Sequence, residues 1–100
     1  MSSPDTSKQW TFVTNHTQVL LCLSGNPDVR LRDVAEAVGI TERAAQRILA
    51  DLVEAGYVQR TRVGRRNRYT VNRDRTMRHD AQLGYRIGSL LDLLGRRPDD

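Results

Sequence analysis

Apolar residues recur at intervals of three or four positions in the first half of the chain. The apolar run 19–23 follows Asn15, a residue type that caps the N-termini of helices. Gly and Pro in the run 25–28 are typical of a turn that ends such a helix. The pattern therefore predicts a first helix that begins near residue 15 and ends before this turn.

Two further helices are predicted by the same periodicity. Residues 31–38 carry one apolar stripe, and Gly39 follows it as a residue that readily adopts the positive φ of a helix end. Thr41 is a suitable N-cap for a third helix, which we expect to run to about Ala55 and to stop at Gly56. The three helices are expected to share one core.

After Gly56 the apolar period changes from helical to alternating. Residues 57–62 and 68–72 resemble two strands, joined by a turn within 63–67. The sequence thus predicts a β-hairpin with arginines on its exposed face, and its buried face is expected to hold Val58, Tyr69 and Val71.

A last helix is predicted from about Arg75 to Leu94. Its apolar positions follow a 4-3-4 spacing and are Leu83, Ile87, Leu90 and Leu94. Leu91 adds to this apolar edge. This edge could fold back onto the first helix, but the spacing favours a seam with a second copy of the chain. Trp10 and Phe12 are expected to pack on this helix or on its mate, and the alternative is that they cover the core of the monomer.

Charge is distributed unevenly along the 100 residues, whose formal net charge is +4. Between Arg60 and Arg78, eight arginines are opposed by Asp74 alone. Such a local basic strip points to a polyanionic partner.

Several classes of protein are disfavoured by the composition. The longest apolar run is far shorter than the roughly 20 residues that span a bilayer, so no membrane partner is expected. Cys22 is the only cysteine, which agrees with the reducing cytoplasm. His16 and His79 belong to no catalytic or metal-binding motif, so we expect no enzyme, no metal and no cofactor.

The span from Leu31 to Ile48 has the features of two helices crossing at a short turn. Such a pair needs a small residue at the crossing, a flexible residue at the turn, and apolar residues that lock the angle. Ala35, Gly39 and Ala45 meet the first two needs, and Ile40 and Ile48 the third.

This segment, together with residues 49–58 and the arginine-rich turn, resembles the winged helix-turn-helix regulators of bacteria. The MarR and ArsR families are the most similar types, and the likeness covers roughly residues 15–72. The chain lacks the long paired terminal helices of typical MarR proteins and the paired cysteines or histidine clusters of metal-sensing ArsR proteins.

The resemblance implies a mainly α fold with a small β-hairpin (α+β), a winged helix-turn-helix with a C-terminal dimerisation helix. The expected organisation is a flexible N-terminus at 1–9, a DNA-binding domain at 10–74, a dimerisation helix at 75–95 and a flexible tail at 96–100.

The resemblance also implies which residues contact DNA. The third helix would enter the major groove with Thr41, Arg43, Ala44, Gln46 and Arg47. The wing would place its cations along the flanking minor groove or its phosphates, through Arg62, Arg65, Arg66 and Arg68. The dimer interface would consist of Trp10, Leu83, Ile87, Leu90, Leu91 and Leu94.

The function expected from the resemblance is sequence-specific binding of double-stranded DNA by a cytoplasmic homodimer that reads an inverted repeat, most simply as a repressor. The alternative is a winged-helix module that binds protein or RNA without reading an operator. Whether a small-molecule effector or a redox signal acts on the chain stays open.

Overall fold

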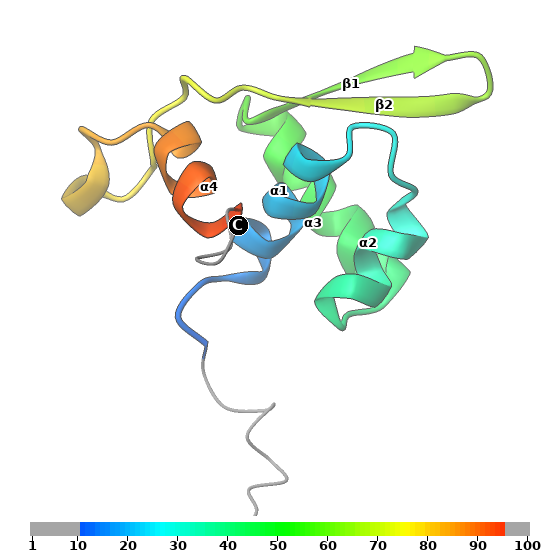
Figure 1. The fold of residues 1–100 in the computed structure, drawn as a ribbon, viewed down its shortest axis with the longest axis horizontal. Helices are drawn as coiled ribbons and strands as arrows, with labels where there is room; N and C mark the ends of the chain where they lie inside the picture. The colour runs from blue at the N-terminus through cyan, green and yellow to red at the C-terminus, as the bar shows by residue number, and fades with distance from the viewer. Residues whose placement is uncertain (1–10, 96–100) are drawn as a thin grey trace, which may run out of the picture.

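The computed structural model describes residues 11–95, and three of its helices form a compact layer beneath a β-hairpin (Figure 1). The helices are α1 (Asn15–Gly25), α2 (Leu31–Val38) and α3 (Glu42–Glu54). Their bounds agree with the helices predicted from the apolar spacing. Trp10 and the proposed flexible ends, 1–9 and 96–100, lie outside the described residues. Phe12 is described and is 93% exposed, so the alternative that it covers the core of the monomer is wrong.

The N-termini of α1 and α3 are both capped by threonine side chains. The Thr14 hydroxyl accepts a hydrogen bond from the N–H of Thr17, so the cap of α1 lies one residue before the predicted Asn15. The Thr41 hydroxyl accepts from the N–H of Ala44 at 3.0 Å, as expected from the sequence. These bonds satisfy donors that the first helical turn leaves without partners.

Two glycines end α2 and α3. Gly39 and Gly56 both have φ of 87°, a left-handed conformation that side chains with a Cβ rarely adopt. The N–H of Gly39 bonds to the carbonyl of Ala35 and so closes the last turn of α2. The angle between α2 and α3 is therefore set at the position that the sequence predicted for the turn.

The core lies where α1, α2 and α3 meet the base of the hairpin. Leu23, Leu49, Val19 and Val34 are its largest fully buried side chains. The side chains of His16 in α1 and Asp51 in α3 also form an exposed hydrogen bond of 2.9 Å across the surface of the bundle. Burial of apolar surface is the main term that holds these elements together.

Strands β1 (Val58–Val63) and β2 (Arg66–Val71) pair antiparallel, from Val58 opposite Val71 to Val63 opposite Arg66. The loop is therefore only Gly64-Arg65, shorter than the predicted turn 63–67. Gly64 has φ of 64°, which a tight hairpin turn with glycine at its first central position requires. Val58 and Tyr69 are buried and Val71 is half-buried, so the predicted inner face of the hairpin is confirmed.

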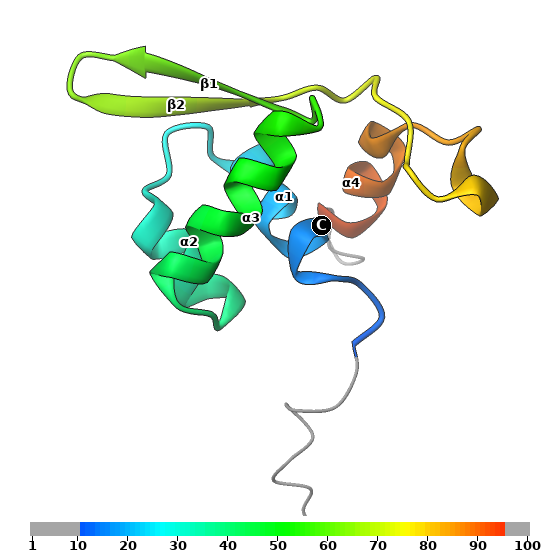
Figure 2. The ribbon, with the colours of Figure 1, turned by 180° about the vertical axis from the view of Figure 1, so that it is seen from behind.

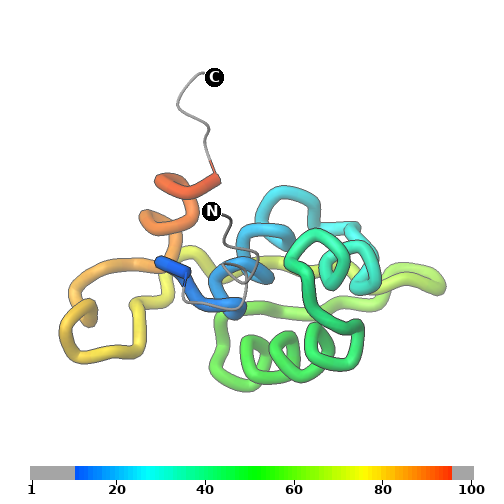
Figure 3. Tube along the Cα trace, turned by 90° about the horizontal axis from the view of Figure 1, so that it is seen from below, coloured from blue at the N-terminus to red at the C-terminus, as the bar shows by residue number. Residues whose placement is uncertain are grey.

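The last helix is much shorter than the sequence suggested. The prediction of a helix from Arg75 onward is wrong, because α4 (Ile87–Gly95) begins twelve positions later, after a loop that contains the short 3₁₀ helix η2 (Asp80–Gln82). Figure 3 shows this loop on one side of the molecule and the hairpin tip on the other.

The loop replaces helix because its backbone bonds to distant partners. The carbonyl of Thr76 accepts from the Tyr57 hydroxyl at 2.5 Å, and the carbonyl of Arg75 accepts from the N–H of Ile87 at 2.7 Å. Gly84 also disfavours a helix here. Periodicity alone could not reveal these bonds, since they join segments that are far apart in the sequence.

The predicted leucine seam is divided by this change. Ile87 and Leu91 are 7% and 2% exposed and pack into the core of the same chain, and Leu90 packs against that core. Leu83, which lies outside α4, is 51% exposed and Leu94 is 40% exposed. The four leucine and isoleucine positions therefore do not form one helix face, and α4 packs on α1, which was the alternative left open by the sequence.

Gly88 provides a close approach between α4 and the segment that follows the hairpin. A Cβ on Gly88 would lie 2.9 Å from both the Cβ and the carbonyl oxygen of Arg73. We expect Gly88→Ala to destabilise the fold by about 1–3 kcal/mol through overpacking. Urea unfolding measures this, with Gly84→Ala as the control because no atom lies within 4 Å of its added Cβ. Equal stability of the two variants would contradict this packing.

Candidate nucleic-acid interface

Helix α3 presents two arginines on the side opposite its buried stripe. Ala45, Ile48 and Leu49 face the core, whereas Arg43 and Arg47 are exposed and lie four residues apart on one face. Figure 2 views the molecule from the side of α3, with the hairpin above the helix. The two guanidinium side chains are accessible on this face of α3.

The remaining predicted residues of α3 differ in what they can contribute. Gln46 is exposed, and Ala44 is half-buried with its N–H committed to the Thr41 cap. The Thr41 hydroxyl accepts that bond with its oxygen, so its own proton stays available for donation to an acceptor such as phosphate. Thr41 thus holds the helix end in place and can still make a polar contact.

A groove of about 570 Å³ joins α3 to the hairpin. Gln46 lines it from α3, while Arg60 and Arg66 line it from the two strands. Glu42 lines the same groove, so it carries one carboxylate among the cations. The groove is the place where the exposed side of α3 and the basic strip come together.

Two wing arginines are held by the turn between α1 and α2. Arg68 donates to both carboxylate oxygens of Asp28, through Nε at 2.9 Å and Nη2 at 3.2 Å. Arg66 donates through Nη2 to the backbone carbonyl of Asp28 at 2.7 Å. The N–H of Tyr69 bonds to the carbonyl of Pro27 at 2.9 Å, so strand β2 is fastened to this turn by backbone and side chains together.

The ion pair shifts the acidity of both partners. The hydrogen bond from Arg68 is the main cause that lowers the pKa of Asp28, with the charges of Arg68 and Arg66 acting in the same direction. The same pair raises the pKa of Arg68. Because the pKa of Asp28 is lowered in the folded chain, the stabilisation by this pair is present at neutral pH and is lost as the pH falls through the lowered value.

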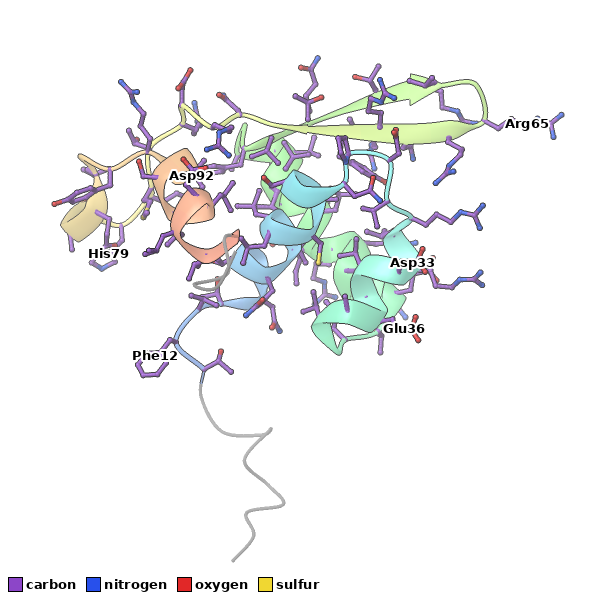
Figure 4. The ribbon with its side chains drawn as sticks, in the orientation of Figure 1. Phe12, Asp33, Glu36, Arg65, His79 and Asp92 are labelled. Carbon is purple, nitrogen blue, oxygen red and sulfur yellow. The ribbon has the colours of Figure 1, made fainter. Side chains whose placement is uncertain are left out.

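The other two predicted wing residues lie toward the hairpin tip. Arg62 donates through Nε to the carbonyl of Gly64 at 3.2 Å and so braces the turn. The side chain of Arg65 extends from the tip away from the body of the molecule (Figure 4). Arg65 is therefore the wing cation that is positioned to reach farthest outward.

Sequence reasoning did not identify Asp28, Arg30 or Arg60 as residues of this surface, and Arg30 and Arg60 both line the groove. Asp28 was interpreted as part of a helix-ending turn, and its partner Arg68 lies forty positions away. Arg60 was counted in the basic strip but not among the contact residues, although it lines the groove with Gln46. Strand alternation, which puts Arg60 on the inner face of the hairpin, is the sequence feature that could have pointed to it.

Residues 11–95 show no metal-binding cluster, no activated thiol and no membrane-spanning helix. In this part of the chain, no group of three or more His, Cys, Asp or Glu side chains is placed to hold a metal ion. Burial raises the pKa of the Cys22 thiol, which disfavours the reactive thiolate. No helix of the described segment has both the length and the apolar character to cross a bilayer.

Comparison with known proteins agrees with this architecture. The model of the MarR family matches residues 12–68, which span α1 to most of the hairpin. The crystal structure of a predicted DNA-binding transcriptional regulator from E. coli superposes with a TM-score of 0.56 at 19% identity, over 78% of this chain and 70% of that chain. This similarity supports the winged helix fold. No curated protein matches the chain.

Proposed function

This chain belongs to the MarR family, which consists of DNA-binding transcription regulators, and from that premise we propose that it binds double-stranded DNA with sequence specificity through α3 and the hairpin. We further propose that it acts as a bacterial, cytoplasmic repressor without enzymatic activity. The single observation that carries the proposal is the groove in which Gln46 of α3 lies with Arg60 and Arg66 of the hairpin.

In the proposed complex α3 lies in the major groove. Arg43 and Arg47 share its outer face, where a guanidinium can pair with guanine in bidentate fashion or bind phosphate. Gln46, the residue before Arg47, lines the protein groove between α3 and the hairpin. Its side-chain amide can pair with adenine. The hairpin then lies along the flanking DNA backbone, with Arg65 at its tip.

Arg65 is proposed to supply affinity that does not depend on sequence. We expect Arg65→Gln to weaken binding to every duplex by a similar factor and to reduce the slope of log K against log salt by about 0.9, the contribution of one phosphate contact. Fluorescence anisotropy titrations at several salt concentrations measure both quantities. An unchanged slope would show that Arg65 makes no phosphate contact.

A homodimer is proposed to read an inverted repeat with half-sites about one turn of DNA apart. Its support is the apolar side chains that remain exposed in the C-terminal part of the described chain, Leu83 before α4 and Leu93 and Leu94 at the end of α4. Trp10, outside the described residues, is proposed to contribute to the same contact. Sedimentation at micromolar concentration is expected to give the dimer mass, and Leu83→Asp with Leu94→Asp to give the monomer. A monomeric parent chain would contradict the proposal.

The proposed function is tested by competition between nucleic acids. A labelled duplex DNA of random sequence is titrated with the chain and challenged with unlabelled duplex DNA or duplex RNA of equal length. We expect DNA to compete at lower concentration than RNA, because α3 fits the major groove of B-form DNA and not the deep, narrow one of A-form RNA. Stronger competition by RNA, or no binding to either, would contradict DNA binding.

A further inference from the structure

Within residues 11–95, the hydrogen bonds that wing arginines make outside the hairpin all go to the turn that precedes α2. Asp28 contributes its carboxylate to Arg68 and its carbonyl to Arg66. Neither residue of the Asp28–Arg68 pair is buried, since the two side chains are about half exposed at 55% and 52%. An acidic residue is thus exposed beside the arginines of a surface that is proposed to bind a polyanion.

This placement is paradoxical for a surface that binds DNA. A carboxylate near phosphates raises the electrostatic free energy of the complex, and it also occupies the fork of Arg68, which is well suited to phosphate. A benefit that offsets this repulsion has to come from what the pair does to the hairpin.

The hairpin has few other restraints on its outer half. Strand β2 bonds to the bundle through the N–H of Tyr69 and the carbonyl of Pro27, near the middle of the strand. Between the last paired residues, Val63 and Arg66, the hairpin consists only of its tip, Gly64 and Arg65. A two-stranded hairpin is marginally stable by itself, so its outer half depends on the two contacts made by Asp28.

Asp28, which accepts the hydrogen bonds of the two arginines, is itself held in place by its turn. The N–H of Asp28 bonds to the side-chain oxygen of Asn26 at 3.1 Å, and the N–H of Val29 bonds to the carbonyl of Asn26 at 3.1 Å. These bonds order the turn before α2 and thereby fix the direction in which the Asp28 carboxylate points. A fixed carboxylate with a bidentate guanidinium constrains orientation as well as distance.

From this geometry we propose that Asp28 and Arg68 are positioning residues of the DNA interface: their ion pair sets the angle of the wing so that Arg65 reaches the DNA backbone, and Arg68 does not itself bind phosphate. The inference rests on the proposed function and revises the role that the family resemblance implied for Arg68. It distinguishes two kinds of wing arginine, one that orders the hairpin and one that contacts the ligand.

A positioning role and a phosphate-binding role of Arg68 predict opposite changes in duplex affinity for the substitution of Asp28. Asp28→Asn removes a negative charge that faces a polyanion, so it should strengthen binding to all duplexes if Arg68 is thereby released to a phosphate. If the pair positions the wing, the same substitution weakens binding, by about threefold, the scale of an exposed ion pair.

The experiment measures duplex affinity and its salt slope for the parent chain, Asp28→Asn, Arg68→Gln and the double variant, with Arg65→Gln as the control for a phosphate contact. We expect each single variant and the double variant to lose about threefold, because either change breaks the same pair. We also expect their slopes to stay at the parent value, unlike that of Arg65→Gln. Tighter binding by Asp28→Asn, additive losses, or a slope reduced by about 0.9 in Arg68→Gln would overturn the inference.

A readout without DNA separates this inference from the proposed function. The N–H of Tyr69 bonds to Pro27 in the clamped hairpin, so its hydrogen exchange should accelerate several-fold in Asp28→Asn and Arg68→Gln but not in Arg65→Gln. Equal exchange of the Tyr69 N–H in the parent chain and the three variants would overturn the clamp, that is, the restraint of the hairpin by the Asp28–Arg68 pair. A parent chain with this exchange pattern that binds no duplex would overturn the proposed function and the DNA role of the clamp together, whereas a parent chain that binds DNA as tightly as Asp28→Asn would overturn the inference alone.

Discussion

Replacing both Arg43 and Arg47 with alanine is expected to lower affinity for a preferred site at least about 30-fold. Each guanidinium that pairs with guanine contributes about 1–3 kcal/mol of discrimination, so two of them contribute about 2 kcal/mol or more. Both side chains are exposed on the outer face of α3, so their removal leaves the core unchanged. The ratio of affinities for the preferred and a scrambled duplex measures the loss.

The matched control removes the same charge elsewhere. Arg78 and Arg86 are exposed on the loop before α4, and their double replacement with alanine lowers the net charge equally. We expect this control to bind somewhat more weakly to both duplexes while keeping the ratio between them. Loss of the ratio in the control, or its retention in the α3 variant, would contradict reading by α3.

The second large effect is expected at Leu49, which connects the outer face of α3 to the core. Leu49 is 2% exposed and belongs to the central cluster with Leu23 and Val34. Leu49→Ala is expected to cost about 2–5 kcal/mol, from lost burial and the cavity left behind. That is a large share of the roughly 5–15 kcal/mol by which a domain is stable.

Urea unfolding followed by circular dichroism measures this cost. Val63→Ala serves as the control, because Val63 is 51% exposed at the hairpin tip and its truncation should change stability by less than about 0.5 kcal/mol. A loss below about 1 kcal/mol for Leu49→Ala would mean that α3 does not pack as described. Because α3 carries the proposed contacts, the same variant should also bind DNA only to the extent that it is folded.

The parts of the fold that sequence reasoning predicted well are those that local chemistry determines. Thr41 caps α3 by accepting a hydrogen bond from the N–H three residues further on, and Gly39 ends α2 through its positive φ. Both could therefore be recognised from a few adjacent residues. The bounds of α2 agree for the same reason. The alternation of Val58, Tyr69 and Val71 likewise reflects burial on one face of a hairpin.

The errors arose where distant segments compete for backbone groups. The helix expected from Arg75 is replaced by a loop because Thr76 and Arg75 bond to Tyr57 and Ile87. Ile87 and Leu91 then pack against α1 in place of a second copy. A leucine spacing is compatible with either partner, so it could not distinguish a dimer seam from a helix folded back on its own chain.

In the candidate interface, too, the features that local sequence determines were predictable and those that depend on long-range contacts were not. The exposure of Arg43, Gln46 and Arg47 follows from the period of one helix and was predictable. The engagement of Arg68 with Asp28 depends on a contact between residues forty positions apart, so composition indicated a basic wing without indicating which arginines are already paired.

DNA reading by α3 is tested most directly by selection of bound sites from a library of random DNA duplexes, with the parent chain and with Arg47→Ala. We expect the parent chain to enrich a defined motif, arranged as an inverted repeat if two copies bind, and Arg47→Ala to relax the preference at one position of each half-site. A parent pool that stays random, or an unchanged motif after loss of Arg47, would contradict the claim that α3 reads DNA.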